Sequence, residues 1–213
     1  MMPGLSREEI ERLAGSGRVE RVARRVVMPL DGPTLAIVVD GWFRVFRNAA
    51  FVRDVTLFLA SAGDVLAPNM IFGERSAESG AEAIADAGLL VMTAEAFESH
   101  AAADPHLYVS LARNLGQRVA RVQTKLEALS RANVEARVAS ALLEIADDFG
   151  VPVPAGVRLD VPLSQEDLAN LAGTTRESCS QAVAAFARLG LVKGGRLRGL
   201  VVTDREALAA LLP

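Results

Sequence analysis

Residues 164–183 restrict the fold of this chain more than any other stretch, because they carry two helix starts separated by a tight turn. Ser164 precedes an apolar segment and has Asp167 three residues later, the pattern of a capped helix N-terminus. Ala169 is small where a second helix must cross closely, and Gly173 follows where the turn needs a left-handed backbone. The stretch therefore predicts a helix-turn-helix, with an ordinary helical hairpin as the alternative.

The second helix of this pair has an apolar face and a polar face. Thr174 or Thr175 can cap its N-terminus. The apolar positions, which we expect to face the core, are Cys179, Val183 and Phe186. The polar positions, which share the opposite face, are Arg176, Glu177, Ser180 and Gln181. A helix whose N-terminal end enters the DNA major groove presents such side chains to base edges, so we expect these four to read bases.

Three of these polar side chains have matching bases. Arg176 can donate a bidentate pair to guanine, Glu177 can accept a hydrogen bond from cytosine, and Gln181 can pair with adenine. Each good pair discriminates against the wrong base by about 1–3 kcal/mol. The helix face therefore has the chemistry to select a DNA sequence.

Hydroxyl and basic residues around this helix suit contacts to DNA phosphates. After Leu191 the sequence predicts two short strands joined by a turn at Gly194 and Gly195, which would form a basic wing. The expected phosphate contacts are Thr174, Thr175, Ser178, Lys193, Arg196 and Arg198. A final helix should start at Thr203 or Asp204.

The net charge of −3 is unusual for a protein that binds nucleic acid, but the charge is unevenly distributed. Residues 174–198 contain five basic side chains and one acidic one, a net +4, which leaves −7 for the rest of the chain. A basic surface on an acidic body can steer one face toward phosphate. A solvated charged face is the alternative.

The N-terminal part of the sequence predicts a small β barrel or sandwich after a short helix. Ser6 and Glu9 form the capping box of a helix over residues 5–14. Asp40 and Gly41 stand between two apolar runs, which is a strong hairpin signal. Short strands are expected at residues 25–28, 35–39, 42–46, 52–59, 65–67 and 89–92.

A long helix should follow, with Asp104 as its N-cap and Pro105 in its first position. Its apolar residues are spaced close to a heptad pattern, which is typical of two helices packed on each other. The expected dimer interface is Tyr108, Leu111, Leu115, Val119, Val122, Leu126 and Leu129. Packing on the β-rich domain is the alternative. Residues 130–133 are the expected hinge, and Asn133 caps a further helix that ends at Gly150.

Composition disfavours several function classes. The single cysteine, Cys179, cannot form an intramolecular disulfide or supply the thiolates of an iron–sulfur cluster or structural zinc site. Its core-facing position indicates a packing residue more than a redox switch. His100 and His106 are not spaced to share one helical face, so neither a metal nor another cofactor is expected.

The sequence has no apolar run long enough to cross a membrane and no recognisable signal peptide. It also has no Gly-rich phosphate loop and no nucleophile elbow. We therefore expect a cytoplasmic protein that is not an enzyme.

The order of the predicted elements resembles the cyclic-AMP receptor protein and fumarate–nitrate regulator (CRP/FNR) family. The most specific matches are residues 163–169 and 175–178, together with Gly41, Gly63 and Asp64. The resemblance implies an α+β chain with an N-terminal β jelly-roll domain similar to cyclic-nucleotide-binding domains (1–103), a dimerisation helix and hinge (104–132), and a winged helix-turn-helix (133–213). It implies a homodimeric transcription regulator that binds a palindromic promoter site and activates by contacting RNA polymerase.

Two departures from the family pattern concern specificity and effector. Members that respond to cyclic AMP have a second arginine where this chain has Gln181, so the half-site should differ. In nucleotide-binding members a short turn separates Phe-Gly-Glu from Arg-Ser-Ala, whereas here residues 72–74 run directly into 75–77. The candidate effector pocket is Glu74, Arg75 and Ser76.

Alignment backward from Phe97 places Ala77 and Glu78 where the family holds the cyclic phosphate, and a carboxylate there would repel phosphate. Val122 and Gln123 match the positions of the family's nucleotide-contacting hydroxyls. We therefore expect independence of cyclic AMP, with another effector or none. The alternative is a small-molecule receptor, with a cyclic nucleotide as one candidate ligand, whose C-terminal domain docks on a protein.

Overall fold

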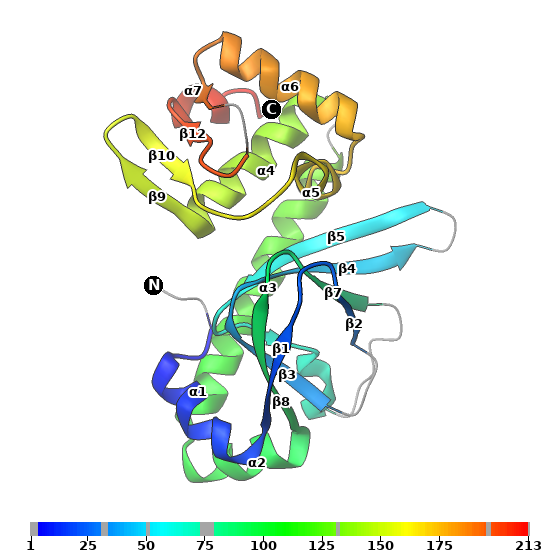
Figure 1. The fold of residues 1–213 in the computed structure, drawn as a ribbon, viewed down its shortest axis with the longest axis vertical. Coiled ribbons are helices and arrows are strands. Elements are labelled where there is room, and N and C mark those ends of the chain that lie inside the picture. Colours follow the sequence, from blue (N-terminus) through cyan, green and yellow to red (C-terminus); the bar gives the residue numbers. More distant parts are fainter. Residues whose placement is uncertain are drawn as a thin grey trace. The chain divides into compact units, whose positions relative to one another are not determined.

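The computed structural model of the chain describes residues 4–30, 34–49, 52–72, 79–130, 133–194 and 197–212. The chain divides into two compact units, Met1–Val122 and Gln123–Pro213. Each unit combines helices with antiparallel sheet, so the fold is α+β as predicted (Figure 1). Among the residues described, no helix is long and apolar enough to cross a membrane.

The first unit begins with helix α1 (Arg7–Leu13) and continues into two four-stranded sheets. The predicted capping box is confirmed: the Ser6 hydroxyl accepts the Glu9 N–H, and the Glu9 carboxylate accepts the Ser6 N–H. The sheet orders are β1-β8-β3-β6 and β2-β7-β4-β5. The other elements are η1 (Ala14–Ser16), β1 (Arg18–Val22), β2 (Val27–Pro29), β3 (Thr34–Asp40), β4 (Trp42–Ala49), β5 (Val52–Ser61), β6 (Val65–Leu66), η2 (Pro68–Phe72), β7 (Ser79–Ala83) and β8 (Ala87–Thr93).

Strand β3 contributes to both layers of the hydrophobic core, because successive residues of a strand point to opposite faces. Ala36 and Val38 pack with Phe43 and Phe58, which come from the other sheet. Complete burial of a large apolar side chain of this kind contributes about 1.5–3 kcal/mol. The two sheets therefore enclose one common core, the arrangement expected of a jelly roll.

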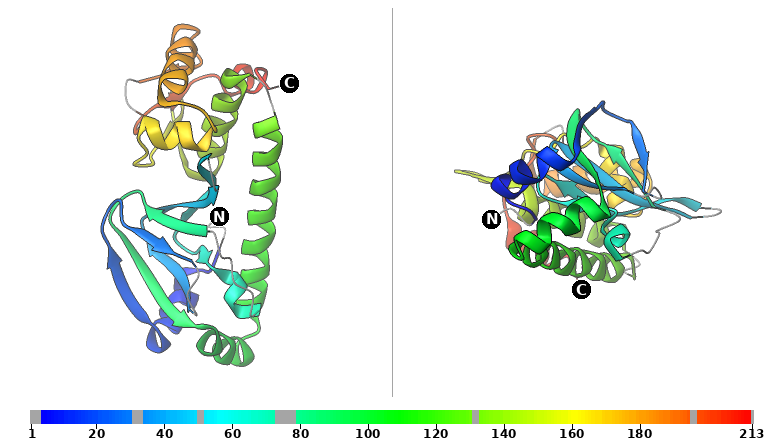
Figure 2. Two further views of the ribbon diagram at one scale, coloured as in Figure 1. Left: turned by 90° about the vertical axis from the view of Figure 1, so that its right-hand side faces the viewer. Right: turned by 90° about the horizontal axis from the view of Figure 1, so that it is seen from below.

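Helices cover the opposite face of β3. Leu35 and Ile37 pack in one cluster with Leu13 of α1, Phe97 of α2 (Ala94–Ala103) and Leu111 of α3 (His106–Ser130). Figure 2 shows α3 running along the strands of this unit. Leu111, which the sequence placed in the predicted dimer interface, is 2% exposed and packs within this core.

The turn at Asp40 and Gly41 does not form the predicted hairpin. Strand β3 pairs with β6 and β8, whereas β4 pairs with β5 and β7, so the turn carries the chain from one sheet to the other. Its local conformation is nevertheless the one expected, since Gly41 has φ 83°. A Cβ at Gly41 would lie 2.5 Å from the Cβ of Ala87, and Arg21 holds the Asp40 carboxylate at 2.6 and 2.9 Å.

Helix α3 begins at His106, one residue later than predicted. The Asp104 carboxylate accepts the His106 backbone N–H at 3.1 Å. The Asp104 backbone N–H donates to the His100 carbonyl, and Asp104 is the C-cap of α2. Asp104 therefore serves two helices, and Pro105 precedes the first residue of α3 instead of occupying it.

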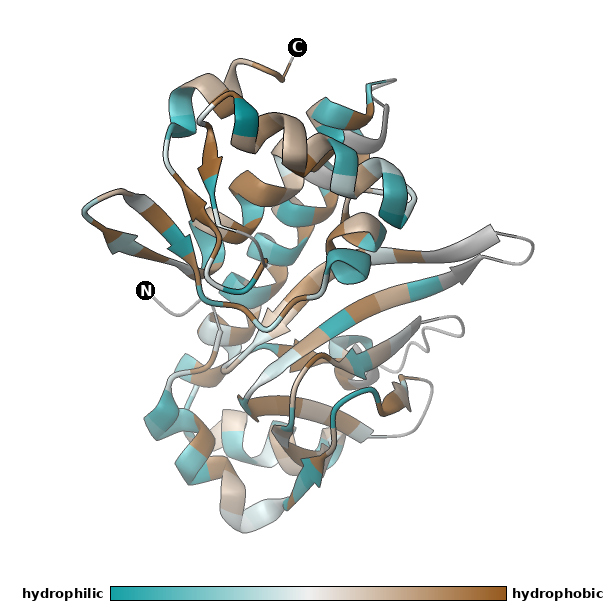
Figure 3. Ribbon diagram, turned by 45° about the horizontal axis from the view of Figure 1, so that its top comes forward, coloured by the Kyte–Doolittle hydropathy of each residue, from teal (hydrophilic) through white to brown (hydrophobic). Residues whose placement is uncertain are grey.

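The second unit is a helical core with a four-stranded sheet of order β11-β12-β10-β9. Helix α4 (Val134–Phe149) has Asn133 as its N-cap and Gly150 as its C-cap, both as predicted. In Figure 3 hydrophilic (teal) and hydrophobic (brown) segments alternate along the helices of this unit, as amphipathic helices require. The remaining elements are β9 (Gly150–Val153), β10 (Gly156–Leu159), α5 (Gln165–Leu171), α6 (Arg176–Arg188), β11 (Val192–Lys193), β12 (Val201–Val202) and α7 (Arg205–Ala209).

Candidate DNA interface

The N-terminus of α5 is held by a reciprocal capping box. The Asp167 N–H donates to the Ser164 hydroxyl at 3.2 Å, and the Asp167 carboxylate accepts the Ser164 N–H at 2.7 Å. Asp167 is 3% exposed, so the box is part of the packed structure. The first helix of the predicted pair therefore starts where the sequence placed it.

The turn after α5 is a Schellman motif. The Thr174 N–H donates to the Ala169 carbonyl at 2.9 Å, and the Gly173 N–H donates to the Asn170 carbonyl at 3.3 Å. Gly173 has φ 60°, which only glycine adopts at low cost. The turn is consequently short and rigid, and it determines where the next helix begins.

A residue outside the predicted site supports this turn. Arg137 on α4 donates from Nε to the carbonyl of Ala172, the C-cap of α5, at 3.2 Å. A basic side chain at this end of a helix satisfies an otherwise unpaired carbonyl and interacts favourably with the helix dipole. Sequence reasoning missed Arg137, because an arginine on a neighbouring helix gives no local signal of this role.

Helix α6 is capped by Thr175, which resolves the choice between the two threonines. The Thr175 hydroxyl accepts the Ser178 N–H at 3.2 Å and donates to the Ser178 hydroxyl at 3.0 Å. Thr174 is half-buried in the turn, and Thr175 is exposed. The hydroxyls therefore cluster at the positive end of the helix dipole.

One face of α6 is buried in the second unit. Cys179, Ala182 and Phe186 are at most 3% exposed, and Val183 is half-buried. Burial raises the pKa of the Cys179 thiol to about 11. The thiol is therefore a packed, protonated group, and the apolar side chains fix the helix in one rotational setting.

The predicted base-reading residues lie on the rest of the α6 surface. Arg176, Glu177 and Gln181 are exposed, and Ser180 is half-buried, as is Ser178. Because residues three and four apart lie on the same side of a helix, Glu177, Ser180 and Gln181 form a continuous stripe beside Arg176. The structure thus exposes three of the four side chains in the N-terminal half of α6.

The wing follows a second Schellman turn. The Leu191 N–H donates to the Phe186 carbonyl at 2.9 Å, and the Gly190 N–H donates to the Ala187 carbonyl at 3.1 Å. Gly190 has φ 75°. The Thr203 hydroxyl donates to the Gly190 carbonyl at 2.5 Å, which ties the end of α6 to the strand that returns from the wing.

Strands β11 and β12 pair as predicted, but the connection is longer than a turn of two glycines. It spans residues 194–200, and buried Leu197 and Leu200 anchor it. Lys193 and Arg198 are exposed. Arg196 lies outside the described residues. Asp204, one of the two predicted caps, starts α7, because its side chain accepts the Ala207 N–H.

The predicted dimer residues on α3 fall into different environments. Tyr108, Val119 and Leu126 are 42%, 56% and 64% exposed. Leu115 and Val122 are half-buried against the core of the first unit. The Leu129 side chain lies outside the described part of the chain. An apolar surface therefore remains on α3 beside residues that pack on the jelly roll.

The predicted effector residues Glu74, Arg75 and Ser76 lie outside the described residues. The first unit also contains a cation–π contact that the sequence did not reveal: the Arg118 guanidinium lies 4.3 Å from the centroid of the Phe58 ring. Burial lowers the pKa of Arg118 to about 10, although the charge of Asp64 acts in the opposite direction. Helix α3 therefore presents a positive charge to the jelly roll.

The second unit contains a winged helix-turn-helix, a DNA-binding module. It is defined by the helix caps, the Schellman turn, helix α6 and the paired strands β11 and β12.

Residues 136–211 match the model of the Crp-like helix-turn-helix domain. The CRP-like cAMP-activated global transcriptional regulator of Mycobacterium tuberculosis is 31% identical over 180 residues, which cover 84% of this chain and 79% of that protein. The cyclic AMP receptor protein of Thermus thermophilus is 29% identical over 164 residues, which cover 77% and 73%.

Solved structures agree with these relatives. A CRP-family transcriptional regulator from Thermus thermophilus superposes with TM-score 0.71 and 27% identity, over 90% of this chain and 95% of that one. A CooA mutant from Carboxydothermus hydrogenoformans has the same fold, with TM-score 0.79 and 22% identity over 93% and 89%. The chain therefore belongs to the CRP/FNR family, and it is a transcription regulator with a helix-turn-helix DNA-binding domain.

Proposed function

We propose that the protein is a homodimer that reads a two-fold symmetric DNA site with the N-terminal end of α6. The observation that supports this most is the division of α6 into a buried face, with Cys179 and Phe186, and an exposed face, with Arg176, Glu177 and Gln181. Half-buried Ser180 completes the base-reading set. A helix anchored in this way can enter the major groove without rotating out of register.

Contacts to the DNA backbone would position this helix. Thr174, Thr175 and Ser178 lie at its positive end, where backbone amides favour phosphate. Lys193 and Arg198 are exposed next to the wing strands, and Arg196 completes the proposed basic set. These contacts carry no sequence information and would supply most of the salt dependence of binding.

Dimerisation would use the exposed apolar surface of α3. Tyr108, Val119 and Leu126 are large apolar side chains that the described chain leaves in solvent, and exposed patches of this kind mark interaction sites. A parallel pair of these helices would place two recognition helices about 34 Å apart, one turn of DNA. We propose residues 1–103 as the effector domain, 104–132 as the dimerisation helix and hinge, and 133–213 as the DNA-binding domain.

We further propose that the protein acts in the cytoplasm as an activator that contacts RNA polymerase, and that it does so without cyclic AMP. Val122, at a position where the family places a nucleotide-contacting hydroxyl, packs against the jelly-roll core and has no polar group to offer. The CRP-family membership supports the activator role.

The test is a gel shift on a palindrome selected from random DNA. Arg176→Ala should abolish sequence-specific binding and leave the weak salt-dependent binding to other DNA. Arg7→Ala is the control, because it removes the same charge from a side chain of the first unit that is 91% exposed. Specific binding retained by Arg176→Ala would contradict the proposal.

A further inference from the structure

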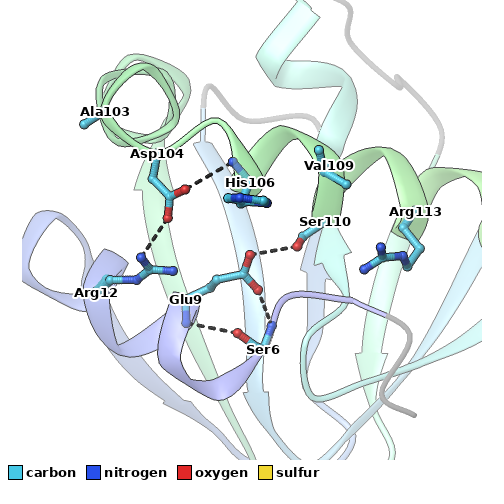
Figure 4. A pocket seen from close by; sticks show the side chains of 9 residues that line it. All are labelled: Ser6, Glu9, Arg12, Ala103, Asp104, His106, Val109, Ser110 and Arg113. Carbon is cyan, nitrogen blue, oxygen red and sulfur yellow. Dashed lines mark hydrogen bonds and ion pairs between the residues drawn. The ribbon is translucent and has the colours of Figure 1, made fainter.

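A polar groove in the first unit plays no part in the proposed reading of DNA. It lies between α1 and the first turns of α3 and has a volume of about 620 Å³ (Figure 4). Small-molecule sites typically occupy about 300–1,000 Å³ and carry a few convergent polar groups. The groove therefore has the size of a ligand site, and its side chains indicate the chemistry of the ligand.

An ionised carboxylate, Glu9, lies in the middle of the groove (Figure 4). Its residue is 7% exposed, and its two oxygens accept the Ser110 hydroxyl at 2.7 Å and the Ser6 N–H at 2.6 Å. Burial alone would raise the pKa of Glu9, but these hydrogen bonds and the charge of Arg12 outweigh burial and lower it. Each carboxylate oxygen can accept a second hydrogen bond, so Glu9 retains capacity for a cation.

A guanidinium of opposite charge lines the same groove. Arg113 follows Ser110 by three residues on the same side of α3. Within the described part of the chain, no carboxylate forms an ion pair with Arg113, whereas Arg12 is bound to Asp104 at 2.7 Å. Arg113 is thus available for an external carboxylate, which a planar guanidinium binds through two hydrogen bonds.

Apolar surface completes the lining. Val109, which is 52% exposed, and Ala103 lie beside the charged groups. A simple anion would meet the charge of Glu9, and a simple cation would meet that of Arg113. A molecule with both charges and a short apolar part matches all three features.

We propose that this groove binds an aliphatic α-amino acid as its zwitterion. The ammonium group would donate to Glu9, the carboxylate would accept from Arg113, and the side chain would lie on Val109. Because the groove joins α1 to α3, bound ligand would stabilise the first unit by mass action. The residues that line the groove include none of the predicted effector residues and none of the proposed DNA-binding residues.

The test begins with calorimetric titration of the full-length protein with each of the standard L-α-amino acids. The best ligand is then compared with its des-amino carboxylate and its decarboxylated amine. The zwitterion should bind about tenfold more tightly than either compound, because each lacks one charge-assisted contact. Equal affinity for the three compounds, or no heat with any amino acid at about 10 mM, would overturn the proposal.

Two variants assign the charges. Arg113→Gln should remove the advantage of the amino acid over the amine, and Glu9→Gln should remove its advantage over the carboxylate. Glutamine at position 9 still completes the capping box, so α1 should remain folded. Arg24→Gln is the matched control, since it removes an exposed charge elsewhere in the first unit. An equal loss of affinity in Arg24→Gln and Arg113→Gln would contradict the assignment. These measurements contain no DNA, so their failure would leave the proposed function untouched.

Discussion

The backbone N–H of Thr174 donates to the carbonyl of Ala169 across 2.9 Å, which closes the turn between α5 and α6 around Gly173. Because α6 begins at Arg176, two residues later, this bond determines how the proposed reading residues leave the domain. The geometry of the proposed DNA interface therefore depends on a backbone hydrogen bond that involves none of the proposed base-reading side chains.

Gly173→Ala should lower the free energy of unfolding by about 1–2 kcal/mol, because alanine at φ 60° is sterically strained. Gly173→Asn should lower the free energy of unfolding by less, since asparagine tolerates the left-handed region better than alanine does. Urea denaturation of the two variants measures the difference. If alanine were as stable as glycine, the backbone explanation of the turn would be wrong.

Cys179 should be unreactive in the folded protein. Its thiol is 0% exposed, and burial raises its pKa to about 11, so the nucleophilic thiolate is scarce at neutral pH. A chromogenic disulfide reagent should label the denatured chain and leave the native chain nearly unlabelled. Rapid labelling of native protein, accompanied by loss of DNA binding, would instead indicate a redox switch.

The same thiol should make stability depend on pH in the alkaline range. A free cysteine has a pKa of about 8.5, so the unfolded chain loses this proton before the folded chain does. The contribution of Cys179 to stability is complete below that pH and is lost as the pH rises toward about 11. The stability difference between wild type and Cys179→Ala should therefore shrink from about pH 8 to pH 10. A constant difference would contradict the protonated, buried thiol.

Val119→Glu should convert the proposed dimer to monomer, because it would place two charges in the proposed apolar α3 interface. Val19→Glu is a matched control, since Val119 and Val19 are 56% and 57% exposed. Sedimentation should show a halved mass for Val119→Glu only, with weaker binding to the palindrome. A dimer that withstands the change at Val119 would place the interface elsewhere.

The helix-turn-helix was predictable because its rules are local. Ser164 and Asp167 cap one helix, and Gly173 makes the turn, within a dozen residues whose identities decide the backbone. The α6 faces followed from the same short-range periodicity. The exact cap, Thr175, needed the structure, because adjacent threonines are equivalent in sequence.

Strand pairing in the jelly roll was harder to predict, because it depends on partners far apart in the chain. The sequence correctly placed a turn at Asp40 and Gly41, but the strands on either side of it, β3 and β4, belong to different sheets and do not pair. The elements that were not predicted include strands β1 and β7, helix α2 and the hairpin of β9 with β10. β1 is an edge strand with charged residues, and β9 tolerates Pro152 because it too is an edge strand.

The apolar spacing of α3 identified one apolar face of the helix. It could not show which residues of that face pack on the jelly roll and which stay exposed. Leu111 packs in the jelly-roll core, whereas Val119 remains exposed, and both fit the same repeat. Similar spacing arises whenever a helix packs on one side, whichever surface covers it. Separating the two required the positions of the strands.

The central claim is that side chains of α6 read bases, and a change of specificity tests it more directly than a loss of binding. DNA bound by wild type and by Gln181→Arg is selected from one random pool. We expect one position in each half-site to change from adenine to guanine, because glutamine pairs with adenine and arginine with guanine. The remaining positions should stay the same. Identical selected sites for the two proteins would contradict a reading role for this face of α6.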